Sequence, residues 1–170
     1  MSAGLPTTLA LSDATKARFA REVAKYPPEQ KQSAVMACLS VVQQELGWVS
    51  AEAEEAVASY LGMPPIAVRE VTTFYNMYNQ QPVGRFKLNV CTNLPCQLRN
   101  GQHALEHLCH RLHVEEGGTT TDRLFTIQKS ECLGACADAP VLLVNDRQMV
   151  SFMTDARLDE LVETLKASAK

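Results

Sequence analysis

Four cysteines in two close pairs constrain this chain more than any other feature of its sequence. Cys91 and Cys96 bound the segment Cys-Thr-Asn-Leu-Pro-Cys, and Cys132 and Cys136 bound Cys-Leu-Gly-Ala-Cys. Soft thiolate ligands favour iron–sulfur clusters, and a [2Fe–2S] centre is typically held by four of them, two on each iron. We therefore interpret the two pairs as the ligands of one [2Fe–2S] cluster, which the fold must bring together.

Other uses of paired cysteines remain open as alternatives. Neither pair has the C-x₂-C spacing of a zinc ribbon or of a thioredoxin redox site, and residues 97–131 make a longer separation than zinc ribbons have. A zinc-stabilised interaction module and a thiol–disulfide oxidoreductase are therefore the rival interpretations. Simple burial as small hydrophobic side chains is disfavoured, because core cysteines have no reason to occur in two close pairs.

Charge and composition exclude several other classes. The net charge is −3 with scattered Lys and Arg, which gives no electrostatic footprint for nucleic acid. The N-terminus lacks the pattern of a signal peptide, and no apolar run approaches the roughly 20 residues that a membrane-spanning helix needs. Six cysteines without an export signal indicate a reducing compartment. We expect a soluble, cytoplasmic protein without direct membrane insertion.

The first half of the chain has the period of amphipathic helices. We expect a flexible tail over residues 1–12 and a helical bundle domain over residues 13–82, with Ser50 as an N-cap and helix ends at Gly47 and Gly62. The apolar positions that predict the buried faces are Phe19, Val23, Tyr26, Val35, Leu39, Val42, Leu46, Val57, Tyr60, Leu61, Ile66, Val68, Val71 and Phe74.

Aromatic residues concentrate between Thr72 and Tyr78. Packing inside the bundle is the favoured interpretation of these rings. A partner surface is the alternative, because aromatic residues and Met are enriched at the cores of protein interfaces.

In the second half, residues 83–170, apolar and polar residues alternate as they do in strands, and helical segments follow. Phe86, Leu88 and Val90 predict a strand that ends at Cys91. A second strand, which ends before Cys132, is predicted from Leu124, Phe125 and Ile127. A helix containing Leu105, Leu108 and Leu112, a hairpin over 141–152 and a final helix from Asp155 complete the order β-α-β-β-β-α. We therefore predict an α+β protein, a helical bundle followed by a thioredoxin-like domain.

Several other residues are weaker functional candidates. Gly134 inside the second pair is expected to let backbone N–H groups point at sulfur. Cys38 and Cys109 stand alone within helices and are expected to pack in cores. The helical face of His103, His107 and His110 could hold a metal, but its polar surroundings favour a solvated surface.

No motif for organic chemistry is present in the sequence. The eight glycines form neither G-x-G-x-x-G nor a P-loop, and there is no G-x-S-x-G. We therefore expect a chain that transfers electrons and carries no catalytic residue and no substrate site of its own.

The segments Cys91–Cys96 and 131–136 closely resemble those of the thioredoxin-like [2Fe–2S] ferredoxins. More specifically, the chain resembles the 24-kDa subunits of the NADH–quinone oxidoreductases, respiratory complex I. The similarity extends over nearly the whole chain and includes Gly47-Trp48-Val49, Thr73-Phe74-Tyr75, Pro82-Val83-Gly84 and Ala139-Pro140.

This resemblance implies a role and partners. Members of that group exchange single electrons between their cluster and the FMN of an NADH-binding flavoprotein subunit. Their helical domain helps to join the subunit to the flavoprotein and to a large iron–sulfur subunit, in the peripheral arm of an inner-membrane-attached complex. Equivalent subunits serve NAD-reducing hydrogenases and NAD-dependent formate dehydrogenases, which are the alternative parent complexes.

Overall fold

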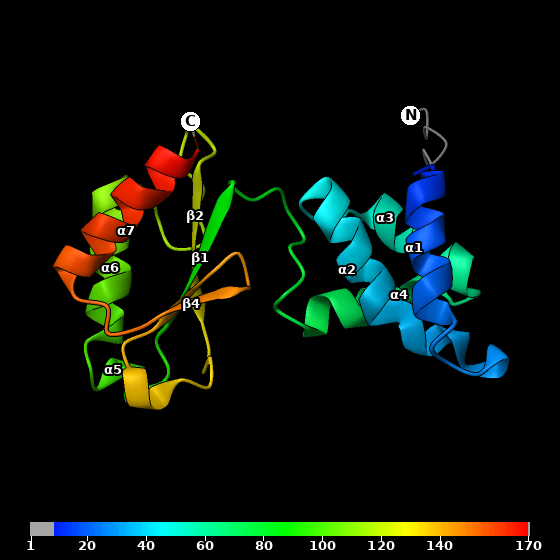
Figure 1. Ribbon diagram of the computed structural model, residues 1–170, viewed down its shortest axis with the longest axis horizontal. Coiled ribbons are helices and arrows are strands. Elements are labelled where there is room, and N and C mark those ends of the chain that lie inside the picture. Colours follow the sequence, from blue (N-terminus) through cyan, green and yellow to red (C-terminus); the bar gives the residue numbers. More distant parts are fainter. Residues whose placement is uncertain (1–8, 170) are drawn as a thin grey trace, which may run out of the picture. The chain divides into compact units, whose positions relative to one another are not determined.

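The computed structural model describes residues 9–169, and its contacts divide the chain into two compact units, Met1–Pro82 and Val83–Lys170. The first unit is helical (Figure 1). Its elements are α1 (Asp13–Val23), the 3₁₀ helix η1 (Pro28–Ala34), α2 (Val35–Leu46), α3 (Ala51–Leu61) and α4 (Pro65–Phe74). Residues 1–8 of the expected tail lie outside the described residues, whereas Leu9 and Leu11 pack against the helical core.

Local sequence signals set the helix ends in this unit. The Ser50 side chain accepts a hydrogen bond from the Ala53 N–H at the start of α3. Gly47 and Gly62 end α2 and α3 in the left-handed conformation that glycine adopts without steric cost. The predicted N-cap and both predicted stops are thus confirmed. The 3₁₀ helix η1 was not predicted, because its residues have no apolar period.

A buried acidic side chain joins α3 to α4. Glu54 is almost fully buried, accepts a hydrogen bond from the Thr72 hydroxyl and pairs with Arg69 at 3.3 Å. A buried carboxylate is tolerated only when such partners compensate its lost hydration. The sequence indicates only that Glu54 lies at a favourable position in the first turn of α3. The contact between the two helices was therefore not predicted.

The prediction of buried apolar faces is wrong at the ends of the helices. Tyr26, Leu46, Ile66 and Phe74 are all exposed, the last two at 65% and 79%. Each lies at or near the end of a helix, where an apolar period in the sequence cannot show that no other helix covers the position.

The favoured interpretation of the aromatic stretch is also wrong for most of its members. Phe74 is 79% exposed, and Tyr75 and Met77 are each 40% exposed. Among the aromatic rings of this stretch, Tyr78 alone is buried as expected, and its hydroxyl donates to the Met36 carbonyl oxygen. The stretch therefore leaves a cluster of large apolar side chains on the surface of the helical unit.

The second unit is a four-stranded sheet with two long helices on one face (Figure 1). Its elements are β1 (Phe86–Cys91), α5 (Leu94–Gln97), α6 (Gly101–Leu112), β2 (Phe125–Ser130), the 3₁₀ helix η2 (Cys136–Asp138), β3 (Leu142–Val144), β4 (Gln148–Val150) and α7 (Asp155–Ser168). The strand order is β2-β1-β3-β4, with β2 parallel to β1 and the other pairs antiparallel. The predicted α+β fold class and the order of its main elements are confirmed.

The core of this unit lies between the sheet and helices α6 and α7. Leu88 and Val90 of β1 pack there with Leu105 of α6 and Leu158 of α7. The other face of β1 is buried too, although it is polar. Lys87 is only 2% exposed, and its ammonium lies 2.7 Å from a carboxylate oxygen of Asp146 in the β3–β4 turn.

Polar side-chain contacts connect the exposed edges of α6 and α7. His103 Nε2 lies 3.0 Å from Asp155 Oδ1, His107 Nε2 lies 3.0 Å from Asp159 Oδ1, and Arg111 continues the series. His103 and His107 thus contact carboxylates of the neighbouring helix, whereas His103 and His110 are exposed to solvent as expected. Within residues 9–169, no helix is long and apolar enough to cross a membrane.

Candidate metal centre

The parallel pairing of β1 and β2 brings the two cysteine pairs together. Cys91 ends β1 and is in register with Ser130, the last residue of β2, and the Thr92 N–H donates to the Ser130 carbonyl oxygen at 3.1 Å. Neighbouring parallel strands end at the same edge of a sheet. The chain therefore leaves β2 toward Cys132 directly beside the loop that begins at Cys91.

The first pair is held inside the protein. Cys91 and Cys96 are each 1% exposed and form a small apolar cluster with Ala139 and Val141. The Cys91 N–H donates to the Val141 carbonyl oxygen at 3.1 Å. Cys96 belongs to the short helix α5, which was not predicted because four residues are too few to show a helical period.

The second pair lies at the surface on an irregular loop. Cys132 and Cys136 are exposed, and their Sγ atoms are 3.6 Å apart. Gly134 between them has a φ of +78°, and its N–H donates to the Cys132 Sγ at 3.4 Å. The predicted N–H donor to sulfur is confirmed at this position.

A polar contact fastens the two loops to each other. The Asn93 side-chain amide donates to the Glu131 carboxylate at 2.8 Å, one residue before Cys132. Neither residue was assigned a role from the sequence. The signal that could have found them is their position, because Asn93 lies inside the first cysteine segment, Glu131 directly precedes the second, and an amide donor suits a carboxylate acceptor.

Gly101 is a second residue whose importance was not predicted. A Cβ atom at this position would lie 2.7 Å from the Cys91 carbonyl oxygen and 2.9 Å from the carbonyl carbon and oxygen of Cys96. The first residue of α6 therefore rests directly on the backbone of both buried cysteines. Its signal in the sequence is a glycine at a helix start five residues after Cys96, where glycine otherwise weakens a helix.

The four thiols influence one another electrostatically. The pKa of Cys96 is raised to about 11, chiefly by burial, with smaller contributions from Cys91 and Cys136 that oppose the lowering effect of a Val141 backbone hydrogen bond. The pKa of Cys136 is raised chiefly by its hydrogen bond with Cys132, with a contribution from the charge of Cys91. The sulfurs are thus close enough to oppose joint ionisation, which a bound metal centre would compensate.

These residues fit a binuclear centre in two ways. All four sequence-predicted cysteines lie at one edge of the sheet, and a backbone N–H already points at one sulfur. Within residues 9–169, no three His, Cys, Asp or Glu side chains form a group that could hold a metal ion, so the two cysteine pairs lie at the same edge without forming one ligand group in this structure. Two separate thiol pairs suit a cluster in which each iron takes two protein ligands.

The remaining cysteines are placed elsewhere. Cys38 is fully buried in the helical core, as predicted, and burial raises its pKa to about 12. Cys109 is half-buried on α6 and packs against the core of the second unit.

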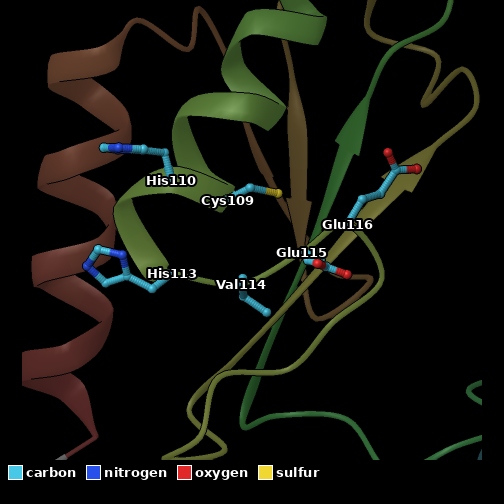
Figure 2. Close-up of a pocket in the computed structure, with 6 residues that line it drawn as sticks. All are labelled: Cys109, His110, His113, Val114, Glu115 and Glu116. Carbon is cyan, nitrogen blue, oxygen red and sulfur yellow. The ribbon is translucent and has the colours of Figure 1, made fainter.

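Cys109 also borders an open surface pocket at the opposite end of α6 from Gly101 (Figure 2). The pocket has a volume of about 520 Å³, and its lining residues are Cys109, His110, His113, Val114, Glu115 and Glu116. In Figure 2 the two histidines point toward α7, whereas Cys109 and Glu116 point the other way. These side chains do not converge, and none of the four paired cysteines lines the pocket.

Comparisons with known proteins agree with the fold and with an iron–sulfur cofactor. Residues 19–166 match the family described as thioredoxin-like [2Fe-2S] ferredoxin. The chain is 42% identical over 147 residues to NADH-quinone oxidoreductase subunit 2 of Thermus thermophilus, covering 86% of this chain and 81% of the relative. It is 39% identical over 142 residues to an NADH-quinone oxidoreductase subunit of Rickettsia prowazekii, covering 83% and 80% respectively.

A solved structure shares the fold at lower identity. An NAD⁺-reducing [NiFe]-hydrogenase in the air-oxidized state matches 80% of this chain with a TM-score of 0.69 and 22% sequence identity. The match spans only 23% of that hydrogenase chain. At this identity the likeness is one of fold.

Proposed function

The chain belongs to the thioredoxin-like [2Fe–2S] ferredoxin family and has that family's [2Fe–2S] cluster as its cofactor, and from this premise we propose that Cys91, Cys96, Cys132 and Cys136 are its four ligands. The observation that carries the proposal is the register of β1 and β2, which sets Cys91 beside the start of the second cysteine loop. When bound, the cluster supplies one-electron redox chemistry. In this function no side chain of the chain acts as a catalyst.

The two loops have different tasks in this proposal. The buried pair, Cys91 and Cys96, anchors one side of the centre in a dry apolar cluster. The exposed pair, Cys132 and Cys136, brings the other side to the surface, where a partner's redox group can approach. The Gly134 N–H stabilises negative charge on sulfur, and such hydrogen bonds tune cluster potentials.

The parent assembly we propose is an NADH–quinone oxidoreductase. Relatives about 40% identical over most of their length carry that name, whereas the hydrogenase alternative rests on likeness of fold. In this assembly the chain exchanges single electrons with the FMN of an NADH-binding flavoprotein subunit. A large iron–sulfur subunit is a further neighbour, and the chain resides on the cytoplasmic side in the peripheral arm.

The experiment that tests this function compares the isolated chain with its assembly. The tagged protein, purified with its stable partners, should contain a flavoprotein, and NADH should bleach the cluster absorbance of the complex. NADH should leave the isolated chain unchanged, because the sequence has no nucleotide-binding motif. NADH oxidation by the isolated chain, or partners without a flavoprotein, would contradict the proposal.

We propose that the helical bundle, residues 13–82, contacts the flavoprotein subunit through an apolar patch formed by Phe74, Tyr75 and Met77. The rings of Phe74 and Tyr75 meet edge-to-face at 5.0 Å, and all three side chains are exposed. Exposed aromatic residues and Met of this kind are enriched where partners dock. The ferredoxin domain, residues 83–170, holds the cluster.

Replacing Phe74 by aspartate should weaken the assembly. A buried aromatic anchor at an interface contributes about 2 kcal/mol or more, which corresponds to roughly 30-fold in affinity. We expect Phe74→Asp to lose most of the co-purified flavoprotein in a pull-down while its iron content stays normal.

Tyr26→Asp provides the matched control for this variant. Tyr26 is also an exposed aromatic residue of the helical unit, but it lies just after α1 and outside the patch. The Tyr26→Asp variant should co-purify with the flavoprotein as the unmodified chain does. Equal retention by both variants would show that the patch is not the docking surface.

A further inference from the structure

The two cysteine pairs differ sharply in their access to solvent. Cys91 and Cys96 are each 1% exposed, whereas Cys132 and Cys136 are exposed on the loop that follows β2. A small-molecule disulfide in solution can therefore reach only the second pair. This asymmetry follows from the fold, because Ala139 and Val141 cover the first pair and nothing in the described residues covers the second.

The exposed sulfurs are also close enough to react with each other. The Sγ atoms of Cys132 and Cys136 are 3.6 Å apart, and a disulfide bond measures about 2.05 Å. Residues 132–135 are irregular, and Gly134 takes a positive φ, which turns the chain back on itself. Closing the remaining gap needs side-chain rotation and a small loop movement, because residues 133–135 between the two cysteines belong to no helix or strand.

We propose that, in the chain that has lost its cluster, Cys132 and Cys136 form a reversible disulfide with each other, and that this bond blocks reloading until it is reduced. The inference rests on the proposed function in one respect, that the same two sulfurs are cluster ligands. It goes beyond that function because it assigns a modification site and makes reloading depend on the thiol redox state.

The oxidant is a small-molecule disulfide such as glutathione disulfide. One protein sulfur attacks it, forming a mixed disulfide and releasing one glutathione. The second protein sulfur then attacks the protein sulfur of the mixed disulfide and releases the other glutathione. Two thiols lose two electrons and two protons, and glutathione disulfide becomes two glutathione thiols. An excess of dithiol reductant reverses both steps.

The test uses the full chain in two forms, cluster-loaded and stripped of iron by an anaerobic chelator. Each form is incubated with glutathione disulfide, quenched in acid, alkylated after unfolding and analysed by peptide mass spectrometry. In the stripped chain we expect Cys132 and Cys136 to be joined, with oxidation about tenfold or more beyond that of Cys91 and Cys96, because access controls exchange. The loaded chain should remain unmodified.

Reloading is measured on the same samples with iron and sulfide. The oxidised chain should take up little of either, and treatment with dithiol should restore uptake. Undiminished uptake by the oxidised chain would overturn the block. Stable glutathione adducts, pairing through Cys91 or Cys96, or no oxidation at all would overturn the disulfide.

Two variants separate this inference from the proposed function. Cys96→Ser should fail to hold a normal cluster yet still form the Cys132–Cys136 disulfide. Cys136→Ser should form no intramolecular disulfide, and circular dichroism of each variant reports whether its fold is kept. If the unmodified chain never binds iron but still forms the bond, the cluster proposal fails and the disulfide assignment stands. If it binds iron and the stripped chain forms no bond, only the disulfide inference fails.

Discussion

Cys132→Ser is expected to abolish the iron–sulfur chromophore while leaving the polypeptide fold unchanged. Removing a partner that merely orients a metal ligand typically lowers metal affinity roughly 10–100-fold. Losing a direct thiolate should cost at least as much, so we expect at least about tenfold less bound iron and sulfide. Because Cys132 is exposed, the cluster-free variant should match the cluster-free parent in stability to within about 0.5 kcal/mol.

Cys109→Ser is the matched control for this substitution. Cys109 belongs to the same unit, but it packs on α6 against the core and away from the paired cysteines. The variant should bind iron and sulfide as the parent does, and the comparison is made by metal analysis, visible absorption and circular dichroism. Normal iron in Cys132→Ser, or equal loss in both variants, would contradict the assignment of the four ligands.

Gly101→Ala is expected to lower cluster content although no ligand changes. Alanine is favoured over glycine in helices by about 1 kcal/mol, so propensity alone predicts a small gain in stability. The added Cβ, however, would lie 2.7 Å from the Cys91 carbonyl oxygen and 2.9 Å from Cys96 backbone atoms. Backbone cannot rotate away as a side chain can, and overpacking of this kind costs about 1–3 kcal/mol.

The steric cost should exceed the gain from propensity, and the relief of the clash should displace the first cysteine pair. We expect a lower free energy of unfolding in urea and a reduced ratio of iron to protein. Gln102→Ala, on the half-exposed neighbouring position of α6, should leave both quantities unchanged. A Gly101→Ala variant that is more stable and fully loaded would show that α6 does not support the cysteine loop.

The elements of the fold were largely predictable because their signals are local. Ser50 caps its helix through its own side chain, and Gly47 and Gly62 end helices by a backbone preference that belongs to the residue itself. The two cysteine pairs were predictable for a different reason. Each pair follows a strand. Because β1 and β2 are parallel neighbours, the two pairs lie at the same edge of the sheet.

What was missed depends on contacts between segments distant in the sequence. Lys87 alternates with the apolar residues of β1, a position that in the sequence indicates a solvent-facing side chain. In the structure it is buried and pairs with Asp146 from the hairpin turn. Gly101 matters because α6 meets the backbone of the cysteine loop there. Phe74 continues an apolar period beyond the point where the bundle covers it.

The cluster assignment is tested most sharply by the iron and acid-labile sulfide content of the anaerobically purified chain, with electron paramagnetic resonance before and after reduction. We expect about two irons and two sulfides per chain. We also expect a rhombic signal only after one-electron reduction, because only then is an unpaired electron present. A colourless protein that holds zinc, or iron without sulfide, would contradict the claim that these four cysteines hold a [2Fe–2S] cluster.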